Sequence, residues 1–294
     1  MNETETNTDL TAELLQGAWD VHMHAAPDVV PRIQQADEVL ADARAAGMAA
    51  IGLKDHCGST AALATVLDTI SGETGPRVFG SITLNPPVGG LNPAAVEAAL
   101  REGARTVWFP TYSAKRHLEL MGRGPFPLAA NETGLTLCGE GGNVRAGVAD
   151  ILSLIAEHDA VLSTGHLAPE ESLILFRAAK EAGVKRMVLT HASLAVTDAP
   201  IEIQREALEL GAWIEHCLLA LTPGERSCSE AEMVGQMQAI GAERVFLTSD
   251  LGQTPNGPVV AGFGQGLARL IAAGLTREEA KLISSVNPER VLVG

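Results

Sequence analysis

The sequence predicts an α/β protein built as a (β/α)8 TIM barrel, and two observations support that fold class. First, one pattern recurs along the 294 residues: a helical segment, a glycine, a short apolar run and then a polar residue. The glycine suits the left-handed residue that ends a helix, and an apolar run without polar alternation suits a parallel strand buried on both faces. Second, eight such runs occur, which is the strand count of this barrel. We therefore expect one barrel domain over residues 1–294.

The strand candidates are separated by segments long enough for a helix, whereas a doubly wound sheet would use fewer strands. The first crossover shows the helical pattern well, because Ala36, Val39, Leu40 and Ala43 follow the spacing of one helix face before Gly47. In chain order the eight candidates lie within residues 17–24, 44–56, 77–85, 101–111, 160–167, 180–191, 208–216 and 239–250.

The fourth unit departs from this pattern. Residues 112–146 are rich in glycine and proline, and "TLCGEGGNV" within them is typical of two short strands around a turn. The stretch "GLTL" is apolar enough to pack. We expect an insertion that replaces the fourth crossover over the barrel mouth, in a form compatible with a β-hairpin flap.

Composition restricts the class of partner. A formal charge of −15 argues against nucleic acid or an anionic membrane, because binding polyanions requires clustered Lys and Arg. No apolar run approaches the roughly 20 residues of a membrane helix, and "MNETETNTDL" lacks the parts of a signal peptide. The four cysteines form no CxxC pair, which argues against a disulfide scaffold or a thiolate zinc site. We expect a soluble cytoplasmic protein that acts on a small molecule, with homo-oligomerisation left open.

Polar residues gather where the strand candidates end. Six of the eight histidines do so, namely His22, His24, His56, His166, His191 and His216. The carboxyl ends of barrel strands converge on the face that carries the chemistry. Residues i and i+2 of a strand point to one side, so His22 and His24 are expected to face the axis together. Two neutral imidazoles can hold a divalent ion there.

Three residues from later strands extend this pair to a ligand set. His166, His191 and Asp250 add nitrogen and oxygen donors that suit zinc first, with manganese or iron as alternatives. A carboxylate such as Asp250 can also take a proton from water whose pKa the metal has lowered. We therefore expect one or two divalent ions, with Asp250 as ligand and general base.

This ordered set resembles the amidohydrolase superfamily of metal-dependent hydrolases. The matching segments are "DVHMH", "STGHL", "VLTHAS", "LTSDLG" and the closing "SSVNPERVLVG". The resemblance implies that His22 and His24 bind the more buried metal, that His166 and His191 bind a second one, and that Asp250 is a first-metal ligand and general base. Members with two metals usually bridge them with a carboxylated lysine or a glutamate from strand four. Here "VWFPTYSAK" offers only Lys115, beyond the strand end, so the number of metals stays open.

Lys54, at the end of the second strand, has two interpretations. It is either carboxylated, bridging two ions as a ligand, or an ammonium that binds a substrate carboxylate or pairs with Asp250. The run "AGMAAIGLKDH" also resembles the Thr-Asp-His segment of the polymerase-and-histidinol-phosphatase family, which would use His56 as a ligand. Against that family, "TSDLG" lacks the histidine that commonly follows its last-strand aspartate.

Other polar residues are expected to contact substrate or to have no special role. His117 and His158 lie away from strand ends and are given no functional role. A guanidinium could meet a substrate carboxylate, and a tyrosine hydroxyl could stabilise an oxyanion. The candidates for substrate contact are His56, His216, Tyr112 and Arg32.

These residues favour a metal-dependent hydrolase that cleaves an amide, cyclic imide, lactam or lactone. The alternatives on the same barrel are phosphoester hydrolysis and decarboxylation, because a fold fixes where a site lies but not which reaction it performs. A protein that only senses or stores metal is disfavoured, since ligands spread over several strands around an open mouth are costly for a purely structural site.

Overall fold

Eight parallel strands form one continuous sheet in the computed structural model, which describes residues 3–123, 125–126, 133–138 and 144–294. The strands pair in chain order, and every pairing is parallel. Each lies inside the segment predicted for it, except that the seventh strand ends one residue later, at Cys217. They are β1 (Trp19–Met23), β2 (Ala50–Leu53), β3 (Arg77–Thr83), β4 (Ala104–Trp108), β5 (Val161–Ser163), β6 (Arg186–Leu189), β7 (Trp213–Cys217) and β8 (Val245–Thr248).

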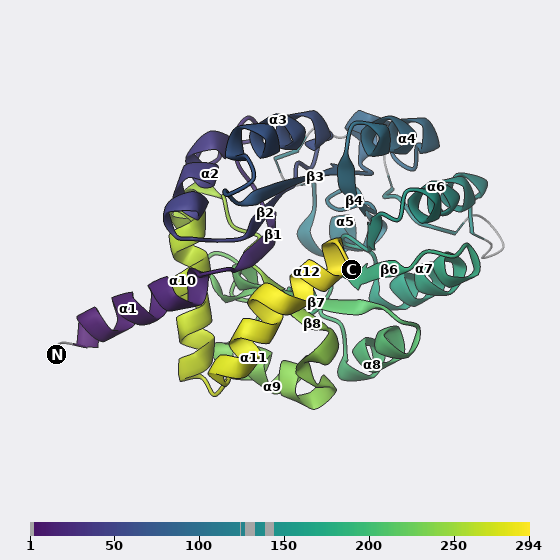
Figure 1. Ribbon diagram of the computed structural model, residues 1–294. Coiled ribbons are helices and arrows are strands. Elements are labelled where there is room, and N and C mark those ends of the chain that lie inside the picture. The colour runs from purple at the N-terminus through teal and green to yellow at the C-terminus, as the bar shows by residue number, and fades with distance from the viewer. Residues whose placement is uncertain (1–2, 124, 127–132, 139–143) are drawn as a thin grey trace.

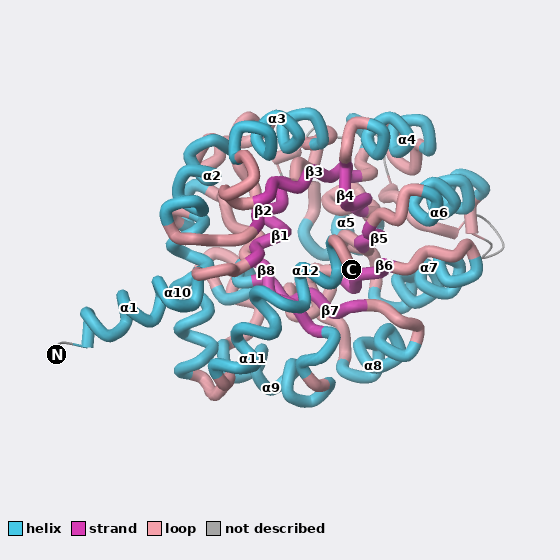
Figure 2. The backbone as a smooth tube through the Cα atoms, in the orientation of Figure 1, coloured by secondary structure: helices cyan, strands magenta, loops and turns pink. Residues whose placement is uncertain are grey.

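The ring closes where the end of β8 meets β1. The backbone N–H of Asp250 donates to the carbonyl of His22 at 2.8 Å, and that of His24 donates to the carbonyl of Leu251 at 2.8 Å. Figure 2 shows the strands as a ring with most of the helices around it. The predicted (β/α)8 barrel is confirmed.

Helices follow the strands around the ring. The first crossover helix buries Ala36, Val39, Leu40 and Ala43, which is the apolar face predicted from their spacing. The described helices are α1 (Glu3–Leu15), α2 (Ala36–Ala45), α3 (Ala61–Ser71), α4 (Pro93–Arg101), α5 (Lys115–Met121), α6 (Ala146–Glu157), α7 (Pro169–Glu181), α8 (Ile201–Glu209), α9 (Glu230–Ile240), α10 (Val259–Ala272), α11 (Arg277–Lys281) and α12 (Asn287–Leu292).

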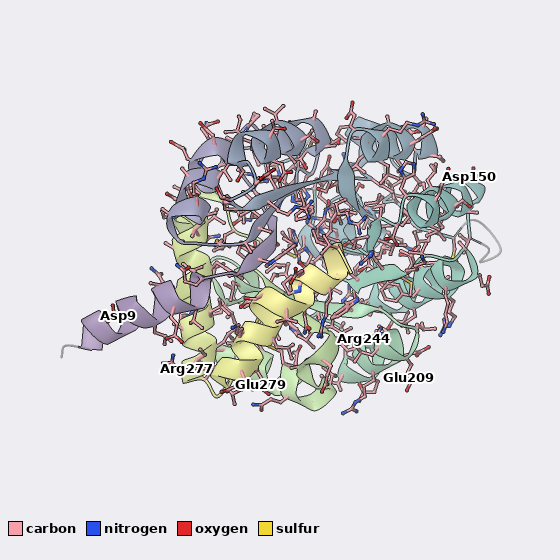
Figure 3. All side chains as sticks on the ribbon, viewed as in Figure 1. Asp9, Asp150, Glu209, Arg244, Arg277 and Glu279 are labelled. Atoms are coloured by element: carbon pink, nitrogen blue, oxygen red, sulfur yellow. The ribbon has the colours of Figure 1, made fainter. Side chains whose placement is uncertain are left out.

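Charged side chains lie on the outer face of the helix ring. Charged residues such as Asp150 and Glu209 are exposed at the periphery (Figure 3). Helix α1 projects from the barrel beside α10 (Figure 1). Among the described helices, none combines the length and the apolar character that crossing a membrane requires.

A helix closes one end of the barrel. An apolar cluster drawn from six strands, including Trp19, Phe79 and Phe246, fills the interior together with Val291 and Leu292 of α12. Figure 1 shows α12 across the opening of the ring. The strands enter the barrel at this end, so the opposite end, where their carboxyl termini lie, is left for polar side chains.

The first strand contains a bulge that sets the direction of His22. The register between β1 and β2 shifts between Asp20 and Met23. Val21 packs in the interior cluster, and the next residue, His22, also faces inward, with its ring centroid 4.4 Å from that of Trp108. A β-bulge turns a side chain in this way. It also needs Gly52, because a Cβ there would lie 2.3 Å from the carbonyl oxygen of Val21.

The insertion after β4 contains a helix that the sequence did not predict. Helix α5 occupies residues 115–121, and Ala114 forms a parallel bridge with Leu135. Cys138 forms an antiparallel bridge with Val144, but the turn predicted between them, at 139–143, lies outside the described residues. The hairpin flap therefore stays a prediction. Because α6 follows as the crossover helix, the insertion adds to the fourth crossover and does not replace it.

Candidate metal centre

Three predicted ligands come together at the open end of the barrel. His22, His191 and Asp250 are buried, and each offers one donor atom within 4.8 Å of the others. His191 and Asp250 follow β6 and β8 with φ values of 58° and 51°. Residues other than glycine are uncommon in this left-handed region, and such strain concentrates at functional sites.

His22 has the surroundings of a metal ligand. Its Nδ1 lies 2.7 Å from Oε1 of Glu215, which also accepts a hydrogen bond from the Thr248 hydroxyl at 2.7 Å. An ionised carboxylate only accepts, so Nδ1 carries the hydrogen and the lone pair of Nε2 faces the other way. That nitrogen lies 3.0 Å from Oδ1 of Asp250 and 2.9 Å from Nζ of Lys54. A carboxylate behind the ring is the usual second partner of a metal-binding histidine.

The donor set fits a divalent ion. Nε2 of His191 is buried and has no hydrogen-bond partner among the described residues. Nδ1 of the same ring lies 3.4 Å from Sγ of Cys217 and 3.8 Å from Oδ2 of Asp250. Burying a polar nitrogen without a partner is costly, and coordination would satisfy it. Two imidazoles and a carboxylate suit zinc, manganese or iron.

Burial sets the charge states of the site. It lowers the pKa of His191 to about 3 and holds that of His166 well below its usual value, so both rings are neutral at pH 7. Burial alone would raise the pKa of Asp250, but the neighbouring His22 and His191 hold it well below its ordinary value. Burial likewise opposes protonation of His22, yet the carboxylates of Asp250 and Glu215 raise its pKa. A metal ion would compete with that proton.

The remaining predicted ligands lie nearby but outside the group of three. His24 Nε2 is 3.1 Å from Oδ1 of Asp250, and its Nδ1 is 3.2 Å from a guanidinium nitrogen of Arg32. The Nδ1 atom of His166 lies 2.8 Å from that of His117. Lys54 is buried, with Nζ also 4.5 Å from the ring centroid of Trp108. Metal binding by these three residues stays a prediction.

A cavity of about 380 Å³ opens beside this group of three residues. Its wall includes Arg32, His56 and Tyr112, for which the sequence predicted substrate contact, and also His166 and Asp250, which it predicted as metal ligands. Its apolar side includes Phe126, whose ring stacks on Tyr112 at 4.5 Å and lies 4.7 Å from His56. A larger cavity of about 920 Å³ between α1, α2 and α10 has no histidine in its wall.

One predicted substrate residue is placed elsewhere. His216 does not line the cavity, and its Nδ1 lies 2.7 Å from the hydroxyl of Ser193. Its neighbour Glu215 faces the metal site instead, as the alternation of strand side chains requires when one of two consecutive residues points inward. Substrate contact by His216 stays a prediction. His117, for which the sequence predicted no role, lines the cavity from α5.

Comparison with known proteins gives a family and a fold. Residues 17–215 match the model of a family of unknown function, DUF6282. The chain belongs to this family. A comparison with curated proteins finds no match.

Solved structures share the barrel over almost the whole length of this DUF6282 member. An amidohydrolase from Pseudomonas aeruginosa aligns with a TM-score of 0.65 at 11% identity, covering 97% of this chain and 98% of its own. An organophosphate-hydrolysing enzyme engineered from a weak promiscuous lactonase aligns with a TM-score of 0.60 at 15% identity, and the alignment covers 96% of each chain. An organophosphorus hydrolase from Deinococcus radiodurans aligns with a TM-score of 0.59 at 15% identity, covering 96% of this chain and 93% of its own. Identities this low show a shared fold.

Proposed function

We propose that this protein is a metal-dependent hydrolase that cleaves the C–N or C–O bond of an amide, cyclic imide, lactam or lactone. The observation that carries the proposal is the buried group of His22, His191 and Asp250 at the carboxyl ends of the strands, beside a cavity large enough for a small molecule. The fold shared with an amidohydrolase and with an enzyme derived from a lactonase supports this reaction class.

The residues of the site would have separate roles in such a reaction. A divalent ion held by His22, His191 and Asp250 would polarise the scissile carbonyl and lower the pKa of water. Asp250 Oδ1 lies within about 3 Å of His22 and His24, whereas Oδ2 lies 3.8 Å from the nearest nitrogen of His191. Oδ2 is therefore the oxygen that can accept a proton from water and return it to the leaving group.

The charge of the cavity favours a neutral substrate over a phosphate monoester. Arg32 is the one arginine or lysine among the described residues of its wall. Its guanidinium is already engaged, with Nε donating to Asp28 Oδ2 at 2.7 Å and Nη2 donating to His24. Apart from a bound metal ion, the described wall therefore offers a phosphate dianion or a substrate carboxylate only the remaining N–H donors of an arginine that already pairs with Asp28. This favours a neutral substrate over those of the phosphoesterase and decarboxylase alternatives, and contact of Arg32 with a substrate carboxylate stays a prediction.

Metal analysis joined to a substrate panel tests the proposal. We expect the purified protein to contain zinc, manganese or iron, and to hydrolyse a lactone, cyclic imide or amide but not a phosphate monoester or an acid that would lose CO₂. His22→Ala should lose metal and activity together while remaining folded, because the residue lies at a strand end. His158→Ala is the matched control, since that histidine is exposed at the end of α6. Wild-type protein that neither binds a divalent ion nor hydrolyses any of these bonds would refute the proposal.

A further inference from the structure

The two histidines at the carboxyl end of β1, His22 within the strand and His24 directly after it, have opposite surroundings. Nδ1 of His22 faces a carboxylate, Glu215, at 2.7 Å. Nδ1 of His24 faces the guanidinium of Arg32, with Nη2 at 3.2 Å. Arg32 is itself fixed, because its Nε donates to Asp28 at 2.7 Å and the side chains of this pair are 3% and 0% exposed.

These partners dictate where each ring carries its hydrogen. A guanidinium has donors only, so Nδ1 of His24 must accept and must hold a lone pair. In a neutral imidazole the hydrogen then lies on Nε2, which donates to Oδ1 of Asp250 at 3.1 Å. In His22 the carboxylate of Glu215 places the hydrogen on Nδ1 and leaves the lone pair on Nε2. A metal needs a nitrogen lone pair, and in His24 the nitrogen nearest Asp250 has none to offer.

We propose that His24 is a positioning residue for Asp250 and not a metal ligand, with Asp28 and Arg32 fixing its ring hydrogen on Nε2. This inference rests on the proposed function, which supplies the metal and the role of Asp250. It departs from the interpretation of the His-x-His pair as two ligands.

The arrangement explains how Asp250 is held. The backbone of Asp250 has a strained φ of 51°. The Nε2–H group of His24 fixes Oδ1 of this residue, while Oδ2 stays available for proton transfer. The ring of His24 is held in turn by stacking on His56, with ring centroids 4.8 Å apart and planes 23° apart. Loss of the Nε2–H donor should therefore disturb Asp250 without removing a donor from the ion.

Matched substitutions at the two histidines separate a ligand from a positioning residue. Gln can keep a donor near the place of Nε2, whereas Leu cannot. We expect His24→Gln and His24→Leu to retain wild-type metal content after dialysis, and the Leu variant to lose kcat by about 10- to 100-fold with the Gln variant falling less. His22→Gln and His22→Leu should both lose the metal. Thermal melting of each variant checks that it is folded. Metal loss in folded His24 variants equal to that in the His22 variants would overturn the inference.

Nuclear magnetic resonance gives a readout that does not depend on activity. In protein labelled with nitrogen-15 histidine and loaded with cadmium-113, we expect coupling of cadmium to one nitrogen of His22 and one of His191. His24 should show no coupling, with its signals assigned by their loss in His24→Gln. In metal-free protein its Nδ1 should be the unprotonated nitrogen. If wild-type protein binds no metal, the proposed function fails, and the metal-free spectrum still decides where the ring of His24 carries its hydrogen. Coupling of cadmium to His24, or a protonated Nδ1 of His24, overturns this inference alone.

Discussion

Glu215 of β7 reaches across the barrel to His22 of β1, with 2.7 Å between its Oε1 and the ring Nδ1. The carboxylate is fully buried, and it keeps the hydrogen of His22 on the side away from Asp250. The same Oε1 also accepts a hydrogen bond from the hydroxyl of Thr248 at 2.7 Å. The two residues therefore form one unit in which β7 orients a proposed metal ligand carried by β1.

Glu215→Gln should weaken metal binding about 10- to 100-fold, because the amide no longer enforces the hydrogen position of His22 and removes a negative charge behind the ring. Titration of metal-free protein with zinc measures the effect. Glu209→Gln makes the same charge change at an exposed position of α8 (Figure 3) and should leave the Kd unchanged. Equal affinities for all three proteins would show that Glu215 does not orient the ligand.

The barrel could be predicted from the sequence because its evidence is local. Each αβ joint repeats the same order of helix, glycine and apolar run, and the stripe from Ala36 to Ala43 is buried as its spacing predicted. His22, His191 and Asp250 were found by the same logic, since strand ends of a parallel barrel share one face.

Other parts of the site depend on contacts between distant segments. The bulge at Val21 exists because of how β1 pairs with β2, and neither strand alone reveals it. The bond between Arg32 and His24 depends on the course of the loop after β1, and His117 reaches the cavity from an insertion without a periodic pattern. Of Glu215 and His216, only the strand register decides which one faces inward.

Gly52→Ala should destabilise the protein by about 1–3 kcal/mol or more, because the added Cβ would lie 2.3 Å from the carbonyl oxygen of Val21 and the backbone would have to move. His22 lies in the same bulge, so metal content should fall with stability. Gly235→Ala in α9 is the control: its Cβ would meet nothing within 4 Å, and the helix should gain roughly 0.5–1 kcal/mol. Urea unfolding measures both. A Gly52→Ala variant as stable as wild type would contradict the assigned role of this glycine.

Asp20 should make stability fall as the pH rises. Burial raises its pKa to about 7 from 3.8, although a bond from the backbone N–H of Ser249 acts in the opposite direction. Between these two pKa values the unfolded chain has lost the proton of Asp20 while the folded protein keeps it. The contribution of Asp20 to the free energy of unfolding is therefore complete below pH 3.8 and lost by about pH 7. The loss amounts to at most about 4 kcal/mol.

Asp20→Asn cannot ionise and keeps an acceptor for Ser249, so its free energy of unfolding should fall less than that of wild type between pH 4.5 and 7.5. Urea titrations of chelator-treated protein measure the difference. Asp9→Asn, at an exposed position of α1, should follow the wild-type curve. Parallel curves for wild type and Asp20→Asn would rule out a raised pKa at this residue.

Lys54→Met should lower the affinity for metal and leave KM unchanged. Nζ of Lys54 lies 2.9 Å from Nε2 of His22, where a protonated ammonium would repel a divalent ion, and burial already lowers the pKa of this amine. The metal-loaded protein therefore requires Lys54 as a neutral amine or as a carboxylated side chain, and both forms add a donor to the ion. KM should not change, because Lys54 is not part of the described cavity wall. Lys115→Met removes an exposed lysine after β4 and serves as the control.

Loss of half the metal from the Lys54 variant, reproduced in wild type by removing bicarbonate, would identify a carboxylated bridge between two ions. Loss of affinity at unchanged stoichiometry would identify an amine beside one ion, and unchanged metal with a raised KM would return Lys54 to the role of a substrate-binding cation.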